Sequence, residues 1–230
     1  MEIFGLQKMT LLDYPGRVAC TVFLGGCDLR CPFCHNSELW DGSARPVMGE
    51  GELLEFLRRR RGLLDGVAVT GGEPLLRDLA PLLREIKALG YPVKLDTNGF
   101  HPARLRALLE EGLVDYVAVD IKNSPARYGE TTGLPEPDLG PLRESVALLL
   151  SGAAADYEFR TTAVDELHGP EDFRAIGEWI AGARVWFLQS FTDRDSVPFA
   201  GLHAPKREKL EEYLAIVRPF VLRAELRGAD

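Results

Sequence analysis

Short runs rich in β-branched and aromatic residues alternate along the chain with longer segments in which leucines recur every three or four residues. The first pattern is typical of strands and the second of amphipathic helices. Repetition of the two in this order predicts a parallel sheet whose crossover connections contain helices. The sequence predicts six such strands, at 18–23, 66–70, 92–96, 116–120, 157–162 and 185–189.

Six strand–helix units are too few to close an eight-stranded barrel, so the sequence predicts an α/β fold with an incomplete, TIM-like (β/α)6 barrel that is open on one side. The unbroken apolar runs at 67–69 and 117–119 indicate central strands with both faces covered. We expect a single domain over 1–230, with a catalytic core at about 1–190 and a helical C-terminal extension at about 203–230. The proline-containing stretch 123–139 is expected to be irregular, and its role stays open.

Polar or glycine-rich residues directly follow the first four predicted strands. Reactive groups of barrel-like α/β folds lie at the carboxyl ends of the strands, so these segments should meet on one rim. The segments are Gly25-Gly26-Cys27, Gly71-Gly72-Glu73-Pro74, Thr97-Asn98-Gly99 and Ile121-Lys122.

Composition and charge narrow the function classes. Hydrophobic residues make up 46% of the chain and charged residues 27%, which excludes an intrinsically disordered protein. The net charge of −8 argues against nucleic acid as a partner. No segment has the length of a membrane span, and the opening residues do not resemble an export signal. We therefore expect a cytoplasmic protein with no membrane partner.

Three of the four cysteines fall within eight residues, in the spacing Cys27-x3-Cys31-x2-Cys34. The fourth, Cys20, lies in the first predicted strand and is expected to be a small buried hydrophobic residue. In a reducing compartment, clustered cysteines indicate a metal or redox centre. Three thiolates would leave one corner of a [4Fe–4S] cube without a protein ligand and free to bind another molecule.

Three other readings of the cysteine segment stay open. Cys31 to His35 spells the C-x-x-C-H haem-attachment pattern, although haem would leave Cys27 without a role. His35 could complete a Cys3His zinc site, although adjacent residues seldom bind one tetrahedral ion together. A thioredoxin-like pair would use two thiols and not the third.

The cysteine spacing with Phe33 before the last cysteine, together with Thr70-Gly71-Gly72-Glu73-Pro74, resembles the motifs of the radical S-adenosylmethionine (SAM) superfamily. In that family, a reduced [4Fe–4S] cluster donates an electron to S-adenosylmethionine, and the resulting 5′-deoxyadenosyl radical removes a hydrogen atom from a substrate. The resemblance implies both cofactors here, with Cys27, Cys31 and Cys34 as the catalytic cluster ligands of a radical SAM oxidoreductase.

The resemblance also implies which residues bind the S-adenosylmethionine. Gly71 and Gly72 would let backbone approach the ligand, and Glu73 would accept a hydrogen bond from its ammonium group. The other polar residues at the strand ends also have ordinary structural explanations: a turn for Asp96 and Asn98, a solvated side chain for Lys122, and a structural ion pair for Arg160. The roles of Asp13 and Gln189 stay open. Further cofactor-binding candidates are Asp96, Asn98, Lys122 and Arg160, and the candidate ligands of a monovalent cation are Asp96, Thr97 and Asp120.

The opening segment Gly5 to Gly16, together with Cys34-His35-Asn36, is similar to activating enzymes of glycyl radical enzymes, most closely those of anaerobic ribonucleoside-triphosphate reductases. This similarity implies hydrogen abstraction from a backbone glycine of a partner protein, with flavodoxin or ferredoxin as electron donor. Alternatives are activation of another glycyl radical enzyme such as pyruvate formate-lyase, radical chemistry on a small molecule, and a zinc or electron-transfer module.

Overall fold

The computed structural model of the chain describes residues 1–228 and is built around an eight-stranded sheet that is parallel except at one edge. Its strand order is β10-β9-β8-β7-β6-β5-β3-β2, and only β2 runs antiparallel to its neighbour β3. The strands are β2 (Gly5–Thr10), β3 (Ala19–Leu24), β5 (Gly66–Gly71), β6 (Val93–Thr97), β7 (Tyr116–Asp120), β8 (Asp156–Ala163), β9 (Trp186–Ser190) and β10 (Ala224–Arg227). A separate small pair joins β1 (Glu2–Ile3) and β4 (Met48–Gly49).

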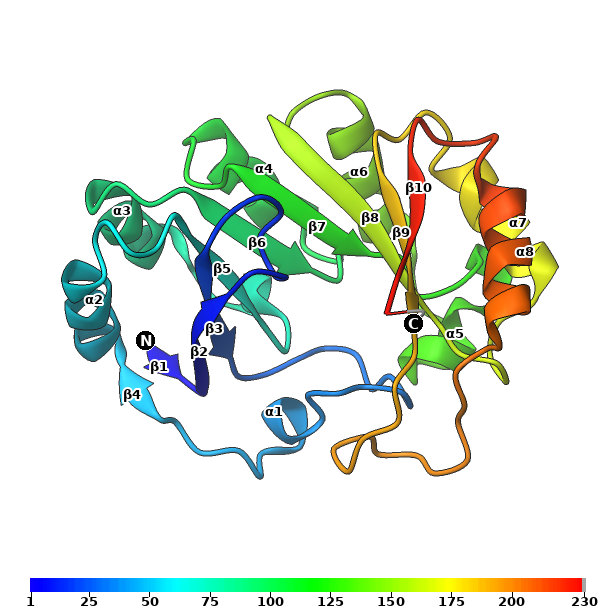
Figure 1. The fold of residues 1–230 in the computed structure, drawn as a ribbon, viewed down its shortest axis with the longest axis horizontal. Coiled ribbons are helices and arrows are strands. Elements are labelled where there is room, and N and C mark those ends of the chain that lie inside the picture. The colour runs from blue at the N-terminus through cyan, green and yellow to red at the C-terminus, as the bar shows by residue number, and fades with distance from the viewer. Residues whose placement is uncertain (229–230) are drawn as a thin grey trace.

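Helices lie around the outer side of the curved sheet, as Figure 1 shows for α2, α3, α4, α6, α7 and α8. Within residues 1–228, none of them is both long enough and apolar enough to cross a membrane. The helices are α1 (Glu38–Asp41), α2 (Glu50–Arg59), α3 (Ala80–Ala88), α4 (Pro102–Glu110), α5 (Tyr128–Thr132), α6 (Gly140–Leu150), α7 (Pro170–Trp179) and α8 (Arg207–Val217), with 3₁₀ turns η1 (Pro74–Leu76) and η2 (Pro125–Arg127).

The predicted α/β fold with a mainly parallel sheet is confirmed, and all six predicted strands are present. Two strands of this sheet were missed, as were the two-residue strands β1 and β4. The edge strand β2 contains few β-branched residues, and β10 lies in the extension that was predicted to be helical. That prediction is right for α8 and wrong for Ala224–Arg227, because pairing with β9 overrides the helical preference of its alanine, glutamate, leucine and arginine. The stretch 123–139 is also less irregular than expected, since it contains η2 and α5.

The two faces of the sheet differ in chemistry. Successive strand residues point to opposite faces, so every second residue shares a face. Val67, Leu95 and Val117 lie on the face that packs against the helices and are fully buried in the apolar core. Asp96 and Arg160 lie on the opposite face, which lines a cavity. The sheet therefore presents a polar, charged inner surface.

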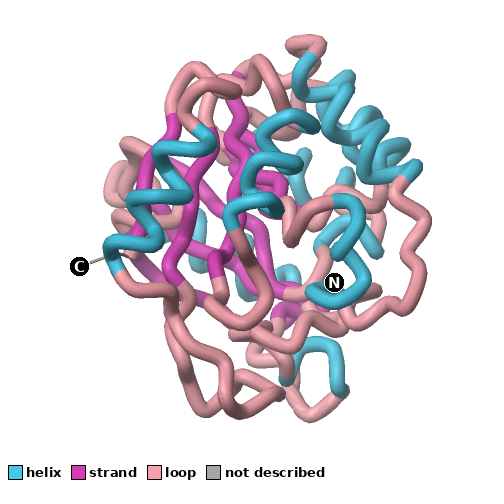
Figure 2. The backbone as a smooth tube through the Cα atoms, turned by 90° about the vertical axis from the view of Figure 1, so that its right-hand side faces the viewer, coloured by secondary structure: helices cyan, strands magenta, loops and turns pink. Residues whose placement is uncertain are grey.

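The long connections gather at one end of the sheet. Figure 2 shows these loops at the lower end of the molecule, and the colours of Figure 1 identify two of them as the connections that follow β3 and β9. The first contains the three clustered cysteines. This end is therefore the rim on which the sequence predicts the chemistry.

Candidate active site

A cavity of about 550 Å³ opens at the carboxyl ends of the strands. It is lined by residues from strands β2, β3, β5, β6, β7, β8 and β9 and from the loops next to them. Every predicted site residue except Glu73 lies on its wall, as do Asp13 and Gln189. The predicted residues that line it are Cys27, Cys31, Cys34, Gly71, Gly72, Asp96, Thr97, Asn98, Asp120, Lys122 and Arg160.

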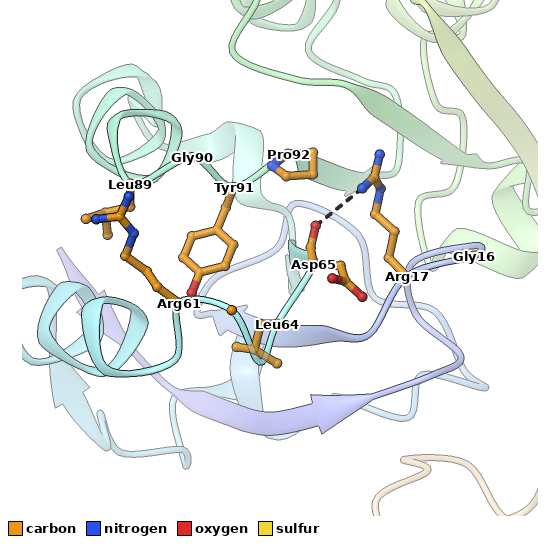
Figure 3. Close-up of a pocket in the computed structure, with 10 residues that line it drawn as sticks. Gly16, Arg17, Arg61, Leu64, Asp65, Leu89, Gly90, Tyr91 and Pro92 are labelled. Carbon is orange, nitrogen blue, oxygen red and sulfur yellow. Dashed lines mark hydrogen bonds between the residues drawn. The ribbon is translucent and has the colours of Figure 1, made fainter.

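A second cavity, of about 360 Å³, lies at the opposite end of the strands and contains none of the predicted site residues. Figure 3 shows Arg17, Arg61 and Tyr91 around it, with Arg17 donating a hydrogen bond of 3.4 Å to the carbonyl oxygen of Asp65. Asp65 and Pro92 precede strands β5 and β6, which places this cavity at the amino ends. The candidate active site is therefore the cavity at the carboxyl ends of the strands, which contains the predicted residues.

The three clustered cysteines have free thiols and lie in the loop that follows β3. Cys31 is buried and Cys27 and Cys34 are half-buried, in an apolar cluster with Leu29 and Phe33. Burial raises the pKa of Cys27 to about 12 and that of Cys31 to about 11. A thiolate at either position therefore requires a bound positive centre, as an iron–sulfur cluster would supply.

His35 is engaged away from the sulfur atoms. Its Nε2 lies 2.6 Å from the carbonyl oxygen of Thr192, and its ring stacks on Phe191 with 5.7 Å between the ring centres. Within residues 1–228, no group of three or more histidine, cysteine, aspartate or glutamate side chains is arranged to hold a single metal ion, so His35 does not complete a Cys3His site. His35 therefore fastens the cysteine loop to the loop that follows β9.

The glycine pair at the end of β5 lets the strand touch the cysteine loop. A Cβ atom on Gly72 would lie 1.9 Å from the carbonyl oxygen of Gly26, and one on Gly71 would lie 2.3 Å from that of Leu24. Gly71 also has φ +121°, a conformation that side chains disfavour. The glycine pair is thus required for contact with the protein's own backbone, and its predicted approach to a ligand stays a prediction.

Glu73 turns its carboxylate into the protein and not into the cavity. Its side chain is 1% exposed and accepts hydrogen bonds from Leu75 N at 2.9 Å, Thr97 Oγ1 at 2.8 Å and Asn98 N at 2.6 Å. Burial raises its pKa to about 7, although these hydrogen bonds act in the opposite direction. In this arrangement Glu73 joins the ends of β5 and β6, and its predicted contact with an ammonium group stays a prediction.

Two residues that sequence reasoning missed position Asn98. Asp28 accepts a hydrogen bond of 2.6 Å from Asn98 Nδ2, and its other oxygen lies 2.9 Å from His101 Nε2. Asp28 adjoins Cys27, so the arrangement ties the end of β6 to the cysteine loop. The position of Asp28 between two clustered cysteines was a usable signal, whereas nothing in the sequence distinguishes His101.

A chain of ion pairs crosses the floor of the cavity. Arg160 lies between two carboxylates, with Nε 2.7 Å from Asp120 Oδ1 and Nη1 3.0 Å from Asp96 Oδ2. Lys122 donates to the other oxygen of Asp120 at 3.1 Å, and Lys94 donates to the other oxygen of Asp96. Lys94 was missed because a single lysine in a strand is normally expected to be exposed.

These pairs favour the charged forms of Asp96, Asp120 and Lys122. Burial acts to raise the pKa of Asp96 and Asp120, but the Arg160 guanidinium and the neighbouring lysines outweigh it and hold both pKa values below their usual range. Burial acts to lower the pKa of Lys122, but Asp120 outweighs it and holds that pKa above its usual range. The cavity floor thus offers fixed charges to an ionic ligand.

The profile of the radical SAM superfamily matches residues 21–151, which include the cysteine segment, the Gly71–Glu73 segment and both carboxylates of the cavity floor. The chain belongs to the radical SAM superfamily. Membership implies that this radical SAM enzyme uses a [4Fe–4S] cluster and S-adenosylmethionine. The donor set fits these groups, because three free thiols and a row of charged side chains share one cavity.

Curated relatives of this radical SAM enzyme have more than one described function. It is 29% identical over 228 residues to a putative glycyl-radical enzyme activating enzyme of Methanocaldococcus jannaschii, covering 95% of this chain and 92% of that protein. It is 39% identical over 116 residues to a 7-carboxy-7-deazaguanine synthase of Hyperthermus butylicus, covering 50% and 48%. A pyruvate formate-lyase-activating enzyme of Clostridium pasteurianum is 34% identical over 128 residues, covering 53% and 52%.

A solved structure supports the architecture. Streptococcus suis SuiB bound to its precursor peptide SuiA superposes with a TM-score of 0.72 at 12% sequence identity, covering 90% of this chain and 48% of SuiB. At that identity the likeness concerns the fold alone. The radical SAM enzyme described here therefore shares the incomplete barrel of its superfamily.

Proposed function

We propose that this radical SAM enzyme activates a glycyl radical enzyme by removing a hydrogen atom from the α-carbon of a backbone glycine in that partner. The observation that carries the proposal is the similarity to the Methanocaldococcus jannaschii protein, which extends along nearly the whole of both chains. The matches to the 7-carboxy-7-deazaguanine synthases of Hyperthermus butylicus and Synechocystis cover only 50% and 60% of this chain.

The open side of the barrel supports a polypeptide substrate. Strands β2 and β10 form the two edges of the sheet, and β2 contributes Gln7 and Thr10 to the cavity wall. Leu12, which also lines the cavity, is 85% exposed, and the adjacent Leu11 is 70% exposed. An exposed apolar pair at the mouth of a reaction cavity is suited to contact with another protein.

This proposal assigns a separate role to each group of cavity residues. Cys27, Cys31 and Cys34 would hold the cluster, and the two cofactors would supply reductive cleavage and a hydrogen-abstracting group when bound. Lys122 and Arg160 present positive charge to the cofactor carboxylate, since both lie on the wall.

We further propose an anaerobic ribonucleoside-triphosphate reductase as the partner and a flavodoxin or ferredoxin as the electron donor. The partner assignment rests on the resemblance of the segments Gly5 to Gly16 and Cys34 to Asn36. Pyruvate formate-lyase is the alternative partner, supported by the pyruvate formate-lyase-activating enzyme among the relatives. The three free thiols of the cavity favour a reducing, cytoplasmic location, and we take 1–230 as one catalytic domain.

The test mixes anaerobically reconstituted enzyme, reductant and S-adenosylmethionine with each candidate partner. A glycyl doublet in the electron paramagnetic resonance spectrum is expected with the true partner. Growing that partner on glycine deuterated at the α-carbon should collapse the doublet to a single narrower signal and place deuterium in the 5′-deoxyadenosine product. A Cys34→Ala enzyme is the matched control and should give neither signal. Deoxyadenosine without deuterium or a glycyl signal, with every partner tried, would exclude the activase function.

The second candidate function is radical chemistry on a small purine-like molecule. It is favoured by the relative from Hyperthermus butylicus, whose local identity of 39% is higher than that of the end-to-end match. The same assay separates the two functions. Deoxyadenosine formation that depends on an added small heterocycle, and not on a protein partner, would support this candidate.

A further inference from the structure

The two carboxylates that the resemblance assigns to a monovalent cation are already paired with cationic side chains. Asp96 accepts hydrogen bonds from Lys94 at one oxygen and from Arg160 at the other. Asp120 accepts from Arg160 and from Lys122 in the same way. Each of the four carboxylate oxygens therefore faces an ammonium or guanidinium hydrogen.

The third predicted ligand of that cation is also engaged elsewhere. Thr97 donates its hydroxyl hydrogen to Glu73 Oε1 at 2.8 Å, and its hydroxyl oxygen accepts a hydrogen bond of 3.1 Å from Gly99 N. A metal cation between Asp96 and Asp120 would lie beside three positive side chains. The described residues therefore do not fit a metal cation at this position.

Lys94 is the unusual member of the group. It lies on β6 two residues before Asp96, on the same face of the strand, and it is 1% exposed. Its Nζ lies 5.9 Å from the ring centre of Tyr116, on the neighbouring strand β7. A buried ammonium is costly unless it is paired, so its presence indicates that Asp96 needs a permanent positive neighbour.

We propose that the Lys94 ammonium takes the place of a metal cation, so that this enzyme binds S-adenosylmethionine without Na⁺ or K⁺. Lys94 acts as a positioning residue, because it neutralises Asp96 and holds it against Arg160. Glu158, 4.0 Å from Arg160, is balanced by its own pair with Arg227 at 3.0 Å. The three cationic side chains, Lys94, Arg160 and Lys122, and the two carboxylates, Asp96 and Asp120, therefore leave one net positive charge for the cofactor carboxylate. The inference goes beyond the proposed function, since it concerns the cofactor and holds for either type of substrate.

The test measures S-adenosylmethionine affinity by anaerobic calorimetry of cluster-reconstituted enzyme, in KCl and in choline chloride at equal ionic strength. Wild-type affinity should be the same in both salts. In choline chloride, Lys94→Met should bind S-adenosylmethionine at least about tenfold more weakly than the wild type does. The reason is that an opposite charge within about 4–6 Å shifts the ionisation equilibrium of its neighbour by one to three powers of ten. KCl should restore part of that loss, since K⁺ can enter the position that the ammonium leaves.

Thermal unfolding of the protein without its cofactors gives a second readout. The unfolding midpoint of Lys94→Met should be higher in KCl than in choline chloride, and that of the wild type should not differ. Lys87→Met is the matched control, because it removes another lysine–aspartate pair, with Asp115 at 2.7 Å, outside the cavity. It should lower the midpoint equally in both salts.

Two results would overturn the inference. The first is wild-type binding that weakens tenfold when K⁺ is replaced by choline, and this result needs no variant. The second is a Lys94→Met enzyme whose affinity and midpoint are equal in the two salts. If Lys94→Met does not fold, Lys94→Gln replaces it with the same expectations, since glutamine retains a hydrogen-bond donor but not the charge. None of these outcomes bears on which partner the enzyme activates.

Discussion

Replacing Gly72 with alanine tests the contact between the end of β5 and the cysteine loop. The new Cβ would lie 1.9 Å from the carbonyl oxygen of Gly26 and 3.4 Å from Cβ of Cys27. Carbon and oxygen atoms that are not bonded stay about 3.3 Å apart, so the two backbones must separate by roughly 1.4 Å. The obstacle is backbone on both sides, and no flexible side chain can move away to relieve it.

The loss of stability can be estimated from the hydrogen bonds that this separation breaks. Gly72 N donates to Leu24 O at 2.9 Å, and Glu73 N donates to Gly26 O at 2.7 Å. Losing both costs about 2 kcal/mol, and the overpacking itself costs about 1–3 kcal/mol. Gly72→Ala should therefore destabilise the protein by about 3–5 kcal/mol, which corresponds to a fall of roughly 10 °C in the unfolding midpoint.

The assay is thermal unfolding, together with iron and sulfide content after anaerobic reconstitution. Gly51→Ala is the control, because a Cβ on Gly51 in α2 meets nothing within 4 Å and alanine should stabilise that helix by about 1 kcal/mol. Gly72→Ala should also bind less iron, since Cys27 moves with Gly26. Equal midpoints and equal iron content in the two variants would refute the reasoning.

Three further predictions concern single side chains. The raised pKa of Glu73, about 7 against an ordinary 4.5, means that its contribution to stability is present below pH 4.5 and is lost as the pH rises to 7. Between pH 4.5 and pH 7, the free energy of unfolding of the wild type in urea should fall by about 3 kcal/mol relative to that of Glu73→Gln, whose side chain does not titrate. Parallel plots of unfolding free energy against pH for the two proteins would contradict this. Cys20→Ala should retain full iron content after reconstitution, because Cys20 is fully buried and does not line the cavity, whereas Cys34→Ala should lose the cluster; equal loss in both would be the contrary result. Lys122→Ala should weaken S-adenosylmethionine binding roughly tenfold in calorimetry, and unchanged affinity would remove its assigned role.

The parallel sheet could be predicted because strand formation and burial give the same local signal here. Runs such as Val67-Ala68-Val69 are apolar and rich in β-branched valine, and they lie in the interior of the sheet. The rule that parallel strands present their carboxyl ends at one rim then brought together motifs far apart in the sequence. Strands β2 and β10 were missed because their stability comes from pairing with a neighbouring strand and not from local preference.

The directions of buried polar side chains could not be predicted. Glu73 follows a strand and precedes a turn, a position from which its carboxylate could face either a ligand or the neighbouring strand. The donors that decide the outcome, Thr97 and Asn98, are more than twenty residues away in sequence. Lys94 is a similar case, because its burial depends on carboxylates and a guanidinium from three different strands.

Strand β10 sets a limit on how far the enzyme could be shortened. Arg227 donates two hydrogen bonds of 3.0 Å to Glu158, whose side chain is fully buried and otherwise accepts one from Tyr116. A truncated enzyme ending at Val217 would keep every residue assigned to the cofactors. Its buried Glu158 carboxylate would, however, retain only the neutral Tyr116 donor and the Arg160 guanidinium, which is 4.0 Å away and is shared with Asp96 and Asp120. The minimal catalytic fragment is thus defined by the electrostatic balance of its interior and extends well past the last recognisable motif.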